Sequence, residues 1–425
     1  MPKKTVVSCK EQELIPDALH PDVWSREYDN KKLIKWDRSW NDGRWGYWTN
    51  FRIGAEWLSS EQAIVVTPKR DMENIDWPAM FLRCFETEEG CEDGLGSIYG
   101  IDLESPQIDD TTLQSVLTPL MVVHFVLAVR RVVRRGLRCG PVVHEDDLPK
   151  VRGKINFVQN LRRNVIAGRA DRVFCRYCEN SVDTPENRLI KRALVFAQRM
   201  CRRMRSQGSR SSEELQARLA QCLVAFERVG EVVSSSEVLH PKRNKLYREY
   251  DAAVRLALLI LRRYDNSVDR MEGVTNSIPP FWIDMSLLYE HYVLGLLREA
   301  YGDKIVYQAG VKTGYPDFLF VDPPASQILD TKYKPRYEGG CPCTDDIRQL
   351  SAYARDRSLL RKLGMSVADQ DCTIVPCVVI YPHEKGSGPA TRFDGCRTPM
   401  QQQKSRDVDE LVEFSLLQVD LPTLR

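Results

Sequence analysis

The hydrophobic pattern of the last third of the chain constrains the fold more than any other feature of the sequence. From about residue 278, segments with apolar residues at helical spacing alternate with short apolar runs typical of strands. The predicted helices span 279–302 and 345–364, and the predicted strands span 304–310, 316–321, 327–334, 372–382 and 414–421. This alternation predicts an α/β domain built on a central mixed sheet.

The rest of the chain divides into two further parts. A length of 425 residues exceeds what one hydrophobic core usually organises. Short strand-like runs and seven of the eight tryptophans, between Trp24 and Trp77, predict a β-rich domain over residues 1–109. The tryptophans suit either the core of that domain, the commoner use, or a recognition surface. Residues 110–270 read as mainly helical and residues 271–425 as the α/β domain, so the predicted fold is α+β and multi-domain.

Charge is distributed unevenly along these parts. The net charge is only +2, yet residues 1–129 hold 13 Lys and Arg against 22 Asp and Glu, residues 130–265 hold 30 against 15, and residues 266–425 hold 18 against 22. A basic middle between acidic ends is typical of a polyanion or acidic-protein contact made by one region, although solvated arginine-rich helices give the same counts. Four arginines close a long predicted helix and are candidates for contact with DNA or a partner: Arg130, Arg131, Arg134 and Arg135. Their alternative role is to oppose the helix dipole.

Targeting signals and metal-binding cysteine motifs are weak in this sequence. The first residues lack the apolar stretch of a signal peptide, and no apolar run reaches membrane-helix length without interruption, so we expect a cytoplasmic protein without a membrane contact. Thirteen scattered cysteines fit reduced thiols. Cys175 and Cys178 have ligand spacing, but no similar pair lies nearby to complete a zinc site.

Two acidic residues and a lysine are predicted to meet on the C-terminal sheet. Asp317 follows Pro316, and Asp330 and Lys332 lie in the next predicted strand, beyond a short loop. If the two strands pair antiparallel, Asp317 stands opposite Asp330, and Lys332 shares their face because side chains alternate along a strand. Two carboxylates suit Mg²⁺ or Mn²⁺, and a lysine beside them can orient or deprotonate a water that attacks a phosphodiester. A plain Asp/Lys ladder on a sheet surface is the structural alternative.

Three helical residues accompany this set. Glu290 lies in the middle of the preceding predicted helix, where it either adds a carboxylate near the metal or is an exposed helix position. Gln349 and Tyr353 are four residues apart on the following helix and therefore share a face. An amide and a phenol there can support the lysine or bind the DNA backbone.

The order of these motifs resembles that of the PD-(D/E)xK nuclease superfamily. More narrowly, the segments DMSLLYEHYV, PDFLFV, ILDTKYK, DIRQLSAYA and VVIYPH look like those of the McrC family, the nuclease subunits of McrBC modification-dependent restriction systems. The likeness continues upstream through RGLRCG, LPKVRGKINF and DTPENRLIKRAL, and covers roughly residues 51–425.

The resemblance implies the chemistry and the partners. It implies a C-terminal PD-(D/E)xK endonuclease in which Asp317, Asp330, Lys332 and Glu290 are catalytic, with Asp317 and Asp330 on Mg²⁺ or Mn²⁺. It also implies an N-terminal region that docks on a hexameric AAA+ GTPase of McrB type, stimulation of that GTPase, and cleavage of modified double-stranded DNA in anti-phage defence. Gln349, Tyr353 and Lys334 are implied to support the site or contact DNA. The chain has no GxxxxGK[ST] motif, so we expect it to bind no nucleotide itself.

Two other functions fit the same residues. One is a PD-(D/E)xK nuclease of another defence or repair system. The other is a non-catalytic adaptor that activates a AAA+ motor and keeps the nuclease fold as a scaffold, although a scaffold has no need of the intact Asp317, Asp330 and Lys332.

Overall fold

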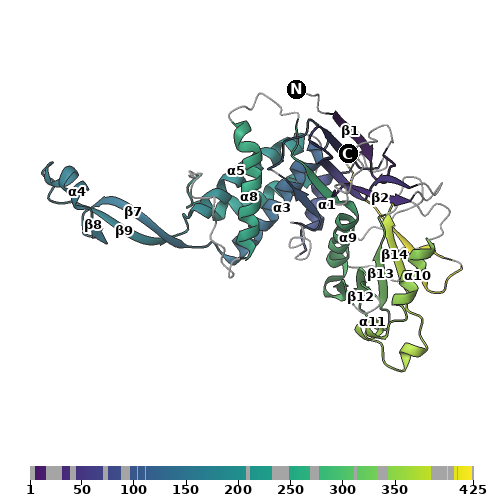
Figure 1. The fold of residues 1–425 in the computed structure, drawn as a ribbon. Coiled ribbons are helices and arrows are strands. Elements are labelled where there is room, and N and C mark those ends of the chain that lie inside the picture. Colours follow the sequence, from purple (N-terminus) through teal and green to yellow (C-terminus); the bar gives the residue numbers. More distant parts are fainter. Residues whose placement is uncertain are drawn as a thin grey trace. The chain divides into compact units, whose positions relative to one another are not determined.

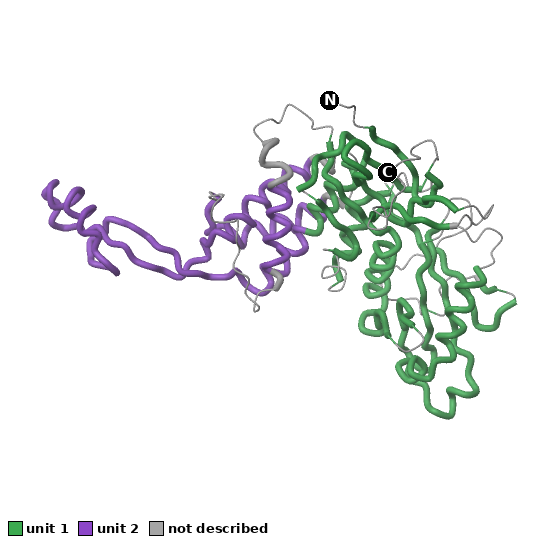
Figure 2. Tube along the Cα trace, in the orientation of Figure 1, with its two compact units in different colours: residues 1–124, 271–425 green, residues 125–270 purple. Residues whose placement is uncertain are grey.

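The computed structural model groups the chain into two compact units, residues 1–124 with 271–425 and residues 125–270 (Figure 2). Figure 1 shows the elements of each unit in sequence colours. The structure describes residues 5–15, 31–38, 45–69, 75–87, 96–102, 104–110, 112–206, 211–231, 248–268, 277–310, 314–333, 343–383, 400, 406–408 and 410–423.

The first unit contains a five-stranded sheet in the order β1-β5-β4-β10-β6, here called the N-terminal sheet. Its strands are β1 (Thr5–Lys10), β4 (Arg52–Trp57), β5 (Gln62–Thr67), β6 (Tyr99–Ile101) and β10 (Phe281–Asp284). β1 pairs parallel with β5, while β4 pairs antiparallel with β5 and with β10. Strand β5, between β1 and β4, is a run of small and β-branched residues, Ala63 to Val66, all fully buried, as expected of a strand covered on both faces.

Strand β10 changes two expectations from the sequence. We predicted a helix from residue 279, but Phe281 to Asp284 form a strand, and helix α9 (Met285–Tyr301) begins after it. The reason is a period of two: Phe281 and Ile283 are buried between β4 and β6, whereas Trp282 and Asp284 are partly exposed. The predicted first and last domains therefore share one sheet, and the structure groups them as a single unit.

The second sheet of this unit is mixed and six-stranded, in the order β11-β12-β13-β14-β16-β15. Its strands are β11 (Ile305–Tyr307), β12 (Phe318–Phe320), β13 (Gln327–Thr331), β14 (Cys377–Pro382), β15 (Arg406–Asp407) and β16 (Phe414–Val419). β11, β12 and β13 pair antiparallel, and β13, β14 and β16 pair parallel. The central mixed sheet predicted for residues 271–425 is therefore present.

Two helices replace the single one predicted after β13. They are α10 (Thr344–Tyr353) and α11 (Arg357–Lys362), and Asp356 caps the second by accepting hydrogen bonds from the backbone of Ser358 and Leu359. Leu350 and Tyr353 of α10 pack in one core cluster with Ile328 of β13. This packing fixes α10 over the face of β13 to which even-numbered residues point. Short 3-10 turns at Gly302–Lys304 and Asp369–Asp371 complete this part.

Smaller elements flank the N-terminal sheet. A hairpin pairs β2 (Ile34–Arg38) with β3 (Trp45–Thr49), and helix α1 (Trp77–Cys84) follows β5. The tryptophans do not serve one purpose: Trp77 is buried, while Trp36 and Trp45 stack on each other at the surface, 53% and 62% exposed.

Helix α3 (Gln114–Arg135) ends before Gly136, and that glycine adopts a left-handed φ of 93°. By length and composition α3 is apolar enough to span a membrane, which the sequence analysis did not expect. However, 78% of its most apolar window is buried inside the structure, as in core helices of soluble proteins.

The second unit combines helices with a long β arm, which is not the mainly helical region predicted. Its helices include α5 (Pro185–Ser206), α6 (Ser211–Ala225) and α8 (Arg248–Val268). The arm pairs β7 (Gly140–Leu148) with β9 (Val173–Ser181), adds the short β8 (Lys154–Ile155), and carries α4 (Phe157–Asn160) and a π-helical turn (Leu161–Val165) at its tip (Figure 1). Apart from Phe174 and Cys175, the residues of both strands are exposed or half-buried, so hydrophobic periodicity did not reveal them.

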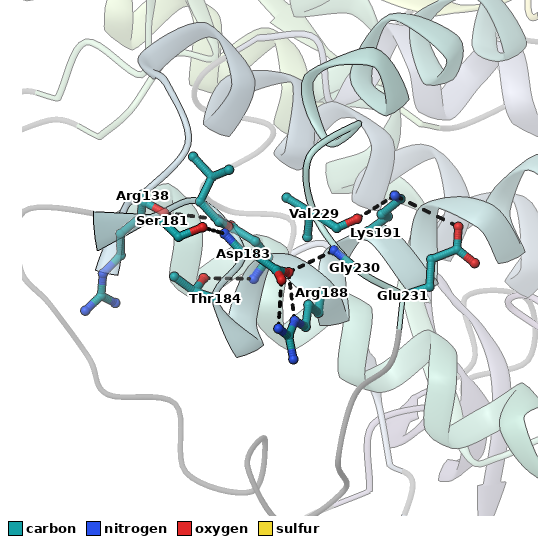
Figure 3. A network of polar contacts seen from close by, with 11 residues as sticks. Arg138, Ser181, Asp183, Thr184, Arg188, Lys191, Val229, Gly230 and Glu231 are labelled. Atoms are coloured by element: carbon teal, nitrogen blue, oxygen red, sulfur yellow. Dashed lines mark hydrogen bonds and ion pairs between the residues drawn. The ribbon is translucent and has the colours of Figure 1, made fainter. Parts of the chain in front are cut away.

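A polar network joins the root of the arm to the helices of the same unit (Figure 3). Asp183 accepts two hydrogen bonds from Arg188, both at 2.7 Å, and one from the backbone of Gly230 at 2.8 Å. Lys191 donates to the carbonyl of Val229. Thr184 caps α5 by accepting a hydrogen bond from the backbone nitrogen of Asn187. The DTPENRLIKRAL segment therefore forms a structural junction between the arm and the helices of the second unit.

Candidate active site

The pairing of β12 with β13 places the two predicted carboxylates opposite each other. The antiparallel register sets Phe318 against Leu329. Carried one residue further, the same register sets Asp317 against Asp330. Asp330 is 1% exposed, whereas Asp317, just outside its strand, keeps part of its surface open to solvent.

Asp317 is anchored by Thr331, the residue between Asp330 and Lys332. Its Oδ2 accepts a hydrogen bond from the backbone nitrogen of Thr331 at 2.7 Å and another from the Thr331 hydroxyl. The sequence did not single out Thr331. These two bonds fix the Asp317 carboxylate against the end of β13 and leave Oδ1 for other contacts.

Lys332 lies among acidic and amide partners. Its Nζ is 2.5 Å from Oδ2 of Asp330 and 3.9 Å from Oδ1 of Asp346, and it donates to Oε1 of Gln349 at 3.2 Å. Burial lowers the pKa of Lys332, but the Asp330 carboxylate beside it raises this pKa more, and the net shift is upward. The side chain is therefore an ammonium group at neutral pH.

Gln349 and Tyr353, predicted from their spacing to share a helical face, belong to the same hydrogen-bonded network as Lys332. Gln349 donates from Nε2 to the Tyr353 hydroxyl at 2.9 Å while its carbonyl oxygen receives Lys332. Tyr353 is 3% exposed, so this end of the hydrogen-bonded network is anchored in the core. Asp346 lies on the same helical face and was missed by the sequence analysis, although its spacing of three from Gln349 is a signal that could have found it.

Glu290 on α9 is near the set rather than exposed on its helix. Its Oε1 accepts a hydrogen bond from Nε2 of Gln308 at 3.2 Å, and the same amide donates to the Tyr307 hydroxyl at 2.9 Å. Burial first, and the Asp330 carboxylate as well, raise the pKa of Glu290. Gln308 has a left-handed φ of 43°, a conformation that a non-glycine residue rarely adopts and that sequence patterns do not reveal.

The three carboxylates influence one another electrostatically. Burial, followed by the Glu290 charge, raises the pKa of Asp317 to about 6. Burial, followed by the Asp317 charge, raises the pKa of Asp330 to about 7. Apart from its ion pair with Lys332, Asp330 Oδ2 is buried and accepts no hydrogen bond from the described residues. Clustered carboxylates that resist ionisation in this way are stabilised by a cation, which is the electrostatic condition for a metal site.

The donor set fits a hard divalent cation held largely by water and phosphate. Among the described residues, no three His, Cys, Asp or Glu side chains stand close enough together to form a protein-only metal site. Asp317 and Asp330 are two carboxylates, and Mg²⁺ is commonly bound by one or two carboxylates with waters and substrate phosphates. Mn²⁺ accepts the same oxygen ligands.

Other predicted site residues are not brought to this place by the described structure. Lys334 lies outside the described residues. Arg130, Arg131, Arg134 and Arg135 form the last turns of α3 in the second unit. Cys175 is buried and Cys178 is exposed, and no metal cluster forms around them among the described residues.

Comparison with known proteins identifies the family. A family model described as McrBC 5-methylcytosine restriction system component matches residues 99–359, more than half of the chain. The chain belongs to the McrBC family. The matched range includes α9, β12, β13 and α10, and therefore every described residue of the candidate site.

Solved structures of McrBC assemblies are similar to this McrBC-family chain over much of its length. A half-complex of Thermococcus gammatolerans McrB AAA+ hexamers with bound McrC is 14% identical, with a TM-score of 0.41, and covers 99% of this chain and 95% of the other. The Thermococcus gammatolerans McrBC complex is 12% identical, with a TM-score of 0.33, and covers 69% of this chain and 87% of the other. The search of curated proteins gave no match.

Proposed function

We propose that this chain is the metal-dependent endonuclease subunit of a McrBC-type restriction complex. The observation that carries the proposal is the convergence of Asp317, Asp330 and Lys332 on one face of a mixed sheet, in a chain of the McrBC family. Gln349 and Tyr353, which the same resemblance singled out, complete the hydrogen-bonded surroundings of the lysine.

In this proposal Asp317 and Asp330 hold Mg²⁺ or Mn²⁺, as in PD-(D/E)xK nucleases. The bound cation supplies charge neutralisation at the phosphate and lowers the pKa of a bound water. The chemical step is hydrolysis: the oxygen of a water forms a bond to phosphorus and gives up a proton to solvent, one ester P–O bond breaks, and the leaving oxygen takes up a proton from solvent.

The chain's own residues supply position and charge for that step. Lys332 donates a hydrogen bond to a phosphate oxygen and stabilises its negative charge, because the raised pKa keeps the lysine protonated. Asp346 and Gln349 hold the ammonium group in place. Glu290, whose pKa is also raised, is placed to orient a water through its carboxylate, and Gln308 fixes that carboxylate.

We further propose a hexameric AAA+ GTPase of McrB type as the partner and modified double-stranded DNA as the substrate. The family description supports 5-methylcytosine as the modification, and the similar structures contain McrC bound to McrB AAA+ hexamers. The chain contains no GxxxxGK[ST] motif, which supports a separate subunit as the place of nucleotide hydrolysis.

Two surfaces are candidates for the partner contact. The family resemblance implies the N-terminal region. The tip of the β arm is a second candidate, because large apolar side chains are exposed there beside basic ones, and exposed apolar groups mark protein contacts. The exposed apolar residues are Phe157, Val158, Leu161, Val165 and Ile166, between 52% and 77% exposed.

The decisive experiment separates cutting from partner activation. In the complex reconstituted with its AAA+ GTPase, GTP, Mg²⁺ and DNA carrying 5-methylcytosine, Asp330→Ala is expected to abolish cleavage and to leave GTPase stimulation intact. Asp345→Ala is the matched control, since this aspartate of α10 is 68% exposed and pairs only with Arg348 in the described contacts. Cleavage that survives Asp330→Ala would show that the active site lies elsewhere, whereas a wild-type complex that stimulates GTP hydrolysis without cutting would favour the adaptor role.

A further inference from the structure

A buried carboxylate from the N-terminal sheet reaches the residue beside Lys332. Glu11 follows β1 directly and is 4% exposed. Its Oε2 accepts a hydrogen bond from the hydroxyl of Tyr333 at 3.3 Å and another from the backbone nitrogen of Lys69 at 3.3 Å. Tyr333 is also 4% exposed and follows Lys332 in the chain. The segment that follows β13, which carries Lys332, is therefore tied to a sheet built mainly from the first hundred residues.

Stability alone does not account for a carboxylate at this position. Oε1 of Glu11 is buried and has no hydrogen-bond partner among the described residues. Burial of such an oxygen costs free energy, and a leucine would fill similar space without that cost. The phenol opposite remains protonated, because burial and the Glu11 carboxylate raise the pKa of Tyr333 well above its usual range, so it stays a hydrogen-bond donor.

The same sheet also holds the other side of the site. Strand β10 lies between β4 and β6 and leads directly into α9, which carries Glu290. Asp284 links β4 to α9. It accepts a hydrogen bond from Arg52 of β4 at 3.1 Å and caps α9 by accepting another from the backbone of Leu287 at 3.2 Å.

The two sides meet through a pair of tyrosines. Tyr289 precedes Glu290, and its ring lies 6.0 Å, centroid to centroid, from the ring of Tyr333. Each tyrosine is thus the chain neighbour of a candidate site residue, and both rings are buried. The N-terminal sheet therefore holds both neighbours of the site, Tyr333 through Glu11 and Tyr289 through β10 and α9.

We propose that Glu11 and Tyr333 are positioning residues through which the N-terminal sheet sets the place of Lys332 relative to Glu290, an inference that rests on the proposed nuclease function. Neither residue touches the reacting atoms in this account. Their effect follows from distance, because misplacement of a catalytic group by about 1 Å can cost about 100-fold in rate.

The test compares matched variants of the full chain in the reconstituted complex. Tyr333→Phe removes only the hydroxyl, and Glu11→Leu removes the acceptor. Both are expected to lower kcat for cleavage of DNA containing 5-methylcytosine by about tenfold at saturating Mg²⁺, with GTPase stimulation unchanged. Glu11→Gln keeps an acceptor oxygen and is expected to cut within about twofold of wild type, which is the rescue that a positioning role requires.

Tyr292→Phe is the control for loss of a buried phenol. Its hydroxyl donates to the backbone oxygen of Asp420 at 3.1 Å, in the same unit but not toward Lys332, and its loss is expected to leave kcat within about twofold. Normal cleavage by Tyr333→Phe, or equal loss in Tyr292→Phe, overturns this inference alone. A wild-type complex that cuts no DNA overturns the proposed function and this inference with it.

Discussion

Lys332 is the most constrained side chain of the candidate site. It contacts Asp330, Asp346 and Gln349, and the acidic neighbours raise its pKa despite burial. A lysine in this state cannot take a proton from water, so of the two roles that the sequence left open, orienting the water fits better than deprotonating it. The charge also offsets part of the repulsion among three carboxylates, which ties the lysine to the stability of the site as well as to its chemistry.

Glu11 makes the stability of the first unit depend on pH. Burial raises its pKa from 4.5 to about 7. Between these values the native state keeps a proton that the unfolded state releases, so the free energy of unfolding falls as pH rises through this window. Below about pH 4.5 both states are protonated and the contribution vanishes.

The amide in Glu11→Gln does not titrate, so this variant is expected to gain stability over wild type as pH rises. The difference approaches about 3 kcal/mol above pH 7 as an upper estimate, and it is close to its minimum near pH 4.5. Thermal and denaturant unfolding of both proteins at pH 5 and pH 8 measure it. A difference that is the same at both pH values would mean that Glu11 is ionised in the native state.

At the scale of elements, the sequence predicts the site better than it predicts the boundaries. The opposition of Asp317 and Asp330 followed from strand alternation, because two short apolar strands joined by a proline-containing loop have few ways to pair. The predicted start of α9 was wrong because the residues from Phe281 to Asp284 suit a helical pattern as well as a strand. The choice between the two depends on β4 and β6, which come from distant parts of the chain. The contacts of Asp346 and Gln308 likewise depend on tertiary packing.

The root of the arm offers a prediction about a single element junction. Asp183→Ala removes the paired bonds to Arg188 and the bond to Gly230, and is expected to cost about 2 kcal/mol locally (Figure 3). Amide hydrogen exchange in 182–191 and 226–231 should then be about 30-fold faster.

The exposed Asp171 of the same unit is the control for this substitution. Asp171→Ala is expected to change local stability by no more than about 0.5 kcal/mol. Unchanged exchange in Asp183→Ala would mean that the hairpin strands, and not this network, hold the arm to the helices.

At the scale of the whole molecule, the basic stretch of the sequence nearly coincides with the second compact unit. Residues 130–265 carry 30 Lys and Arg against 15 Asp and Glu, and the second unit spans residues 125–270. The sheet shared by the predicted first and last domains could not be found in this way, because both domains are acidic and the sheet is formed by pairing of β10 with β4 and β6. Composition detects a change of environment along the chain, but it does not detect a strand that crosses from one segment to another.

This coincidence predicts that the second unit supplies electrostatic contacts to DNA. Each phosphate neutralised by Lys or Arg steepens the fall of log K with log salt by about 0.9, so six to ten contacts lose about 10³- to 10⁵-fold in affinity between 50 and 200 mM salt. Arg134→Ala in the last turn of α3 is expected to reduce that slope by about one contact, with a uniform loss across DNA sequences. Arg357→Ala is the control, because this exposed arginine of the first unit pairs with Asp371. Titration of the full chain with fluorescent double-stranded DNA at several salt concentrations measures the slope, and affinity that is independent of salt would assign the basic surface to a protein partner instead.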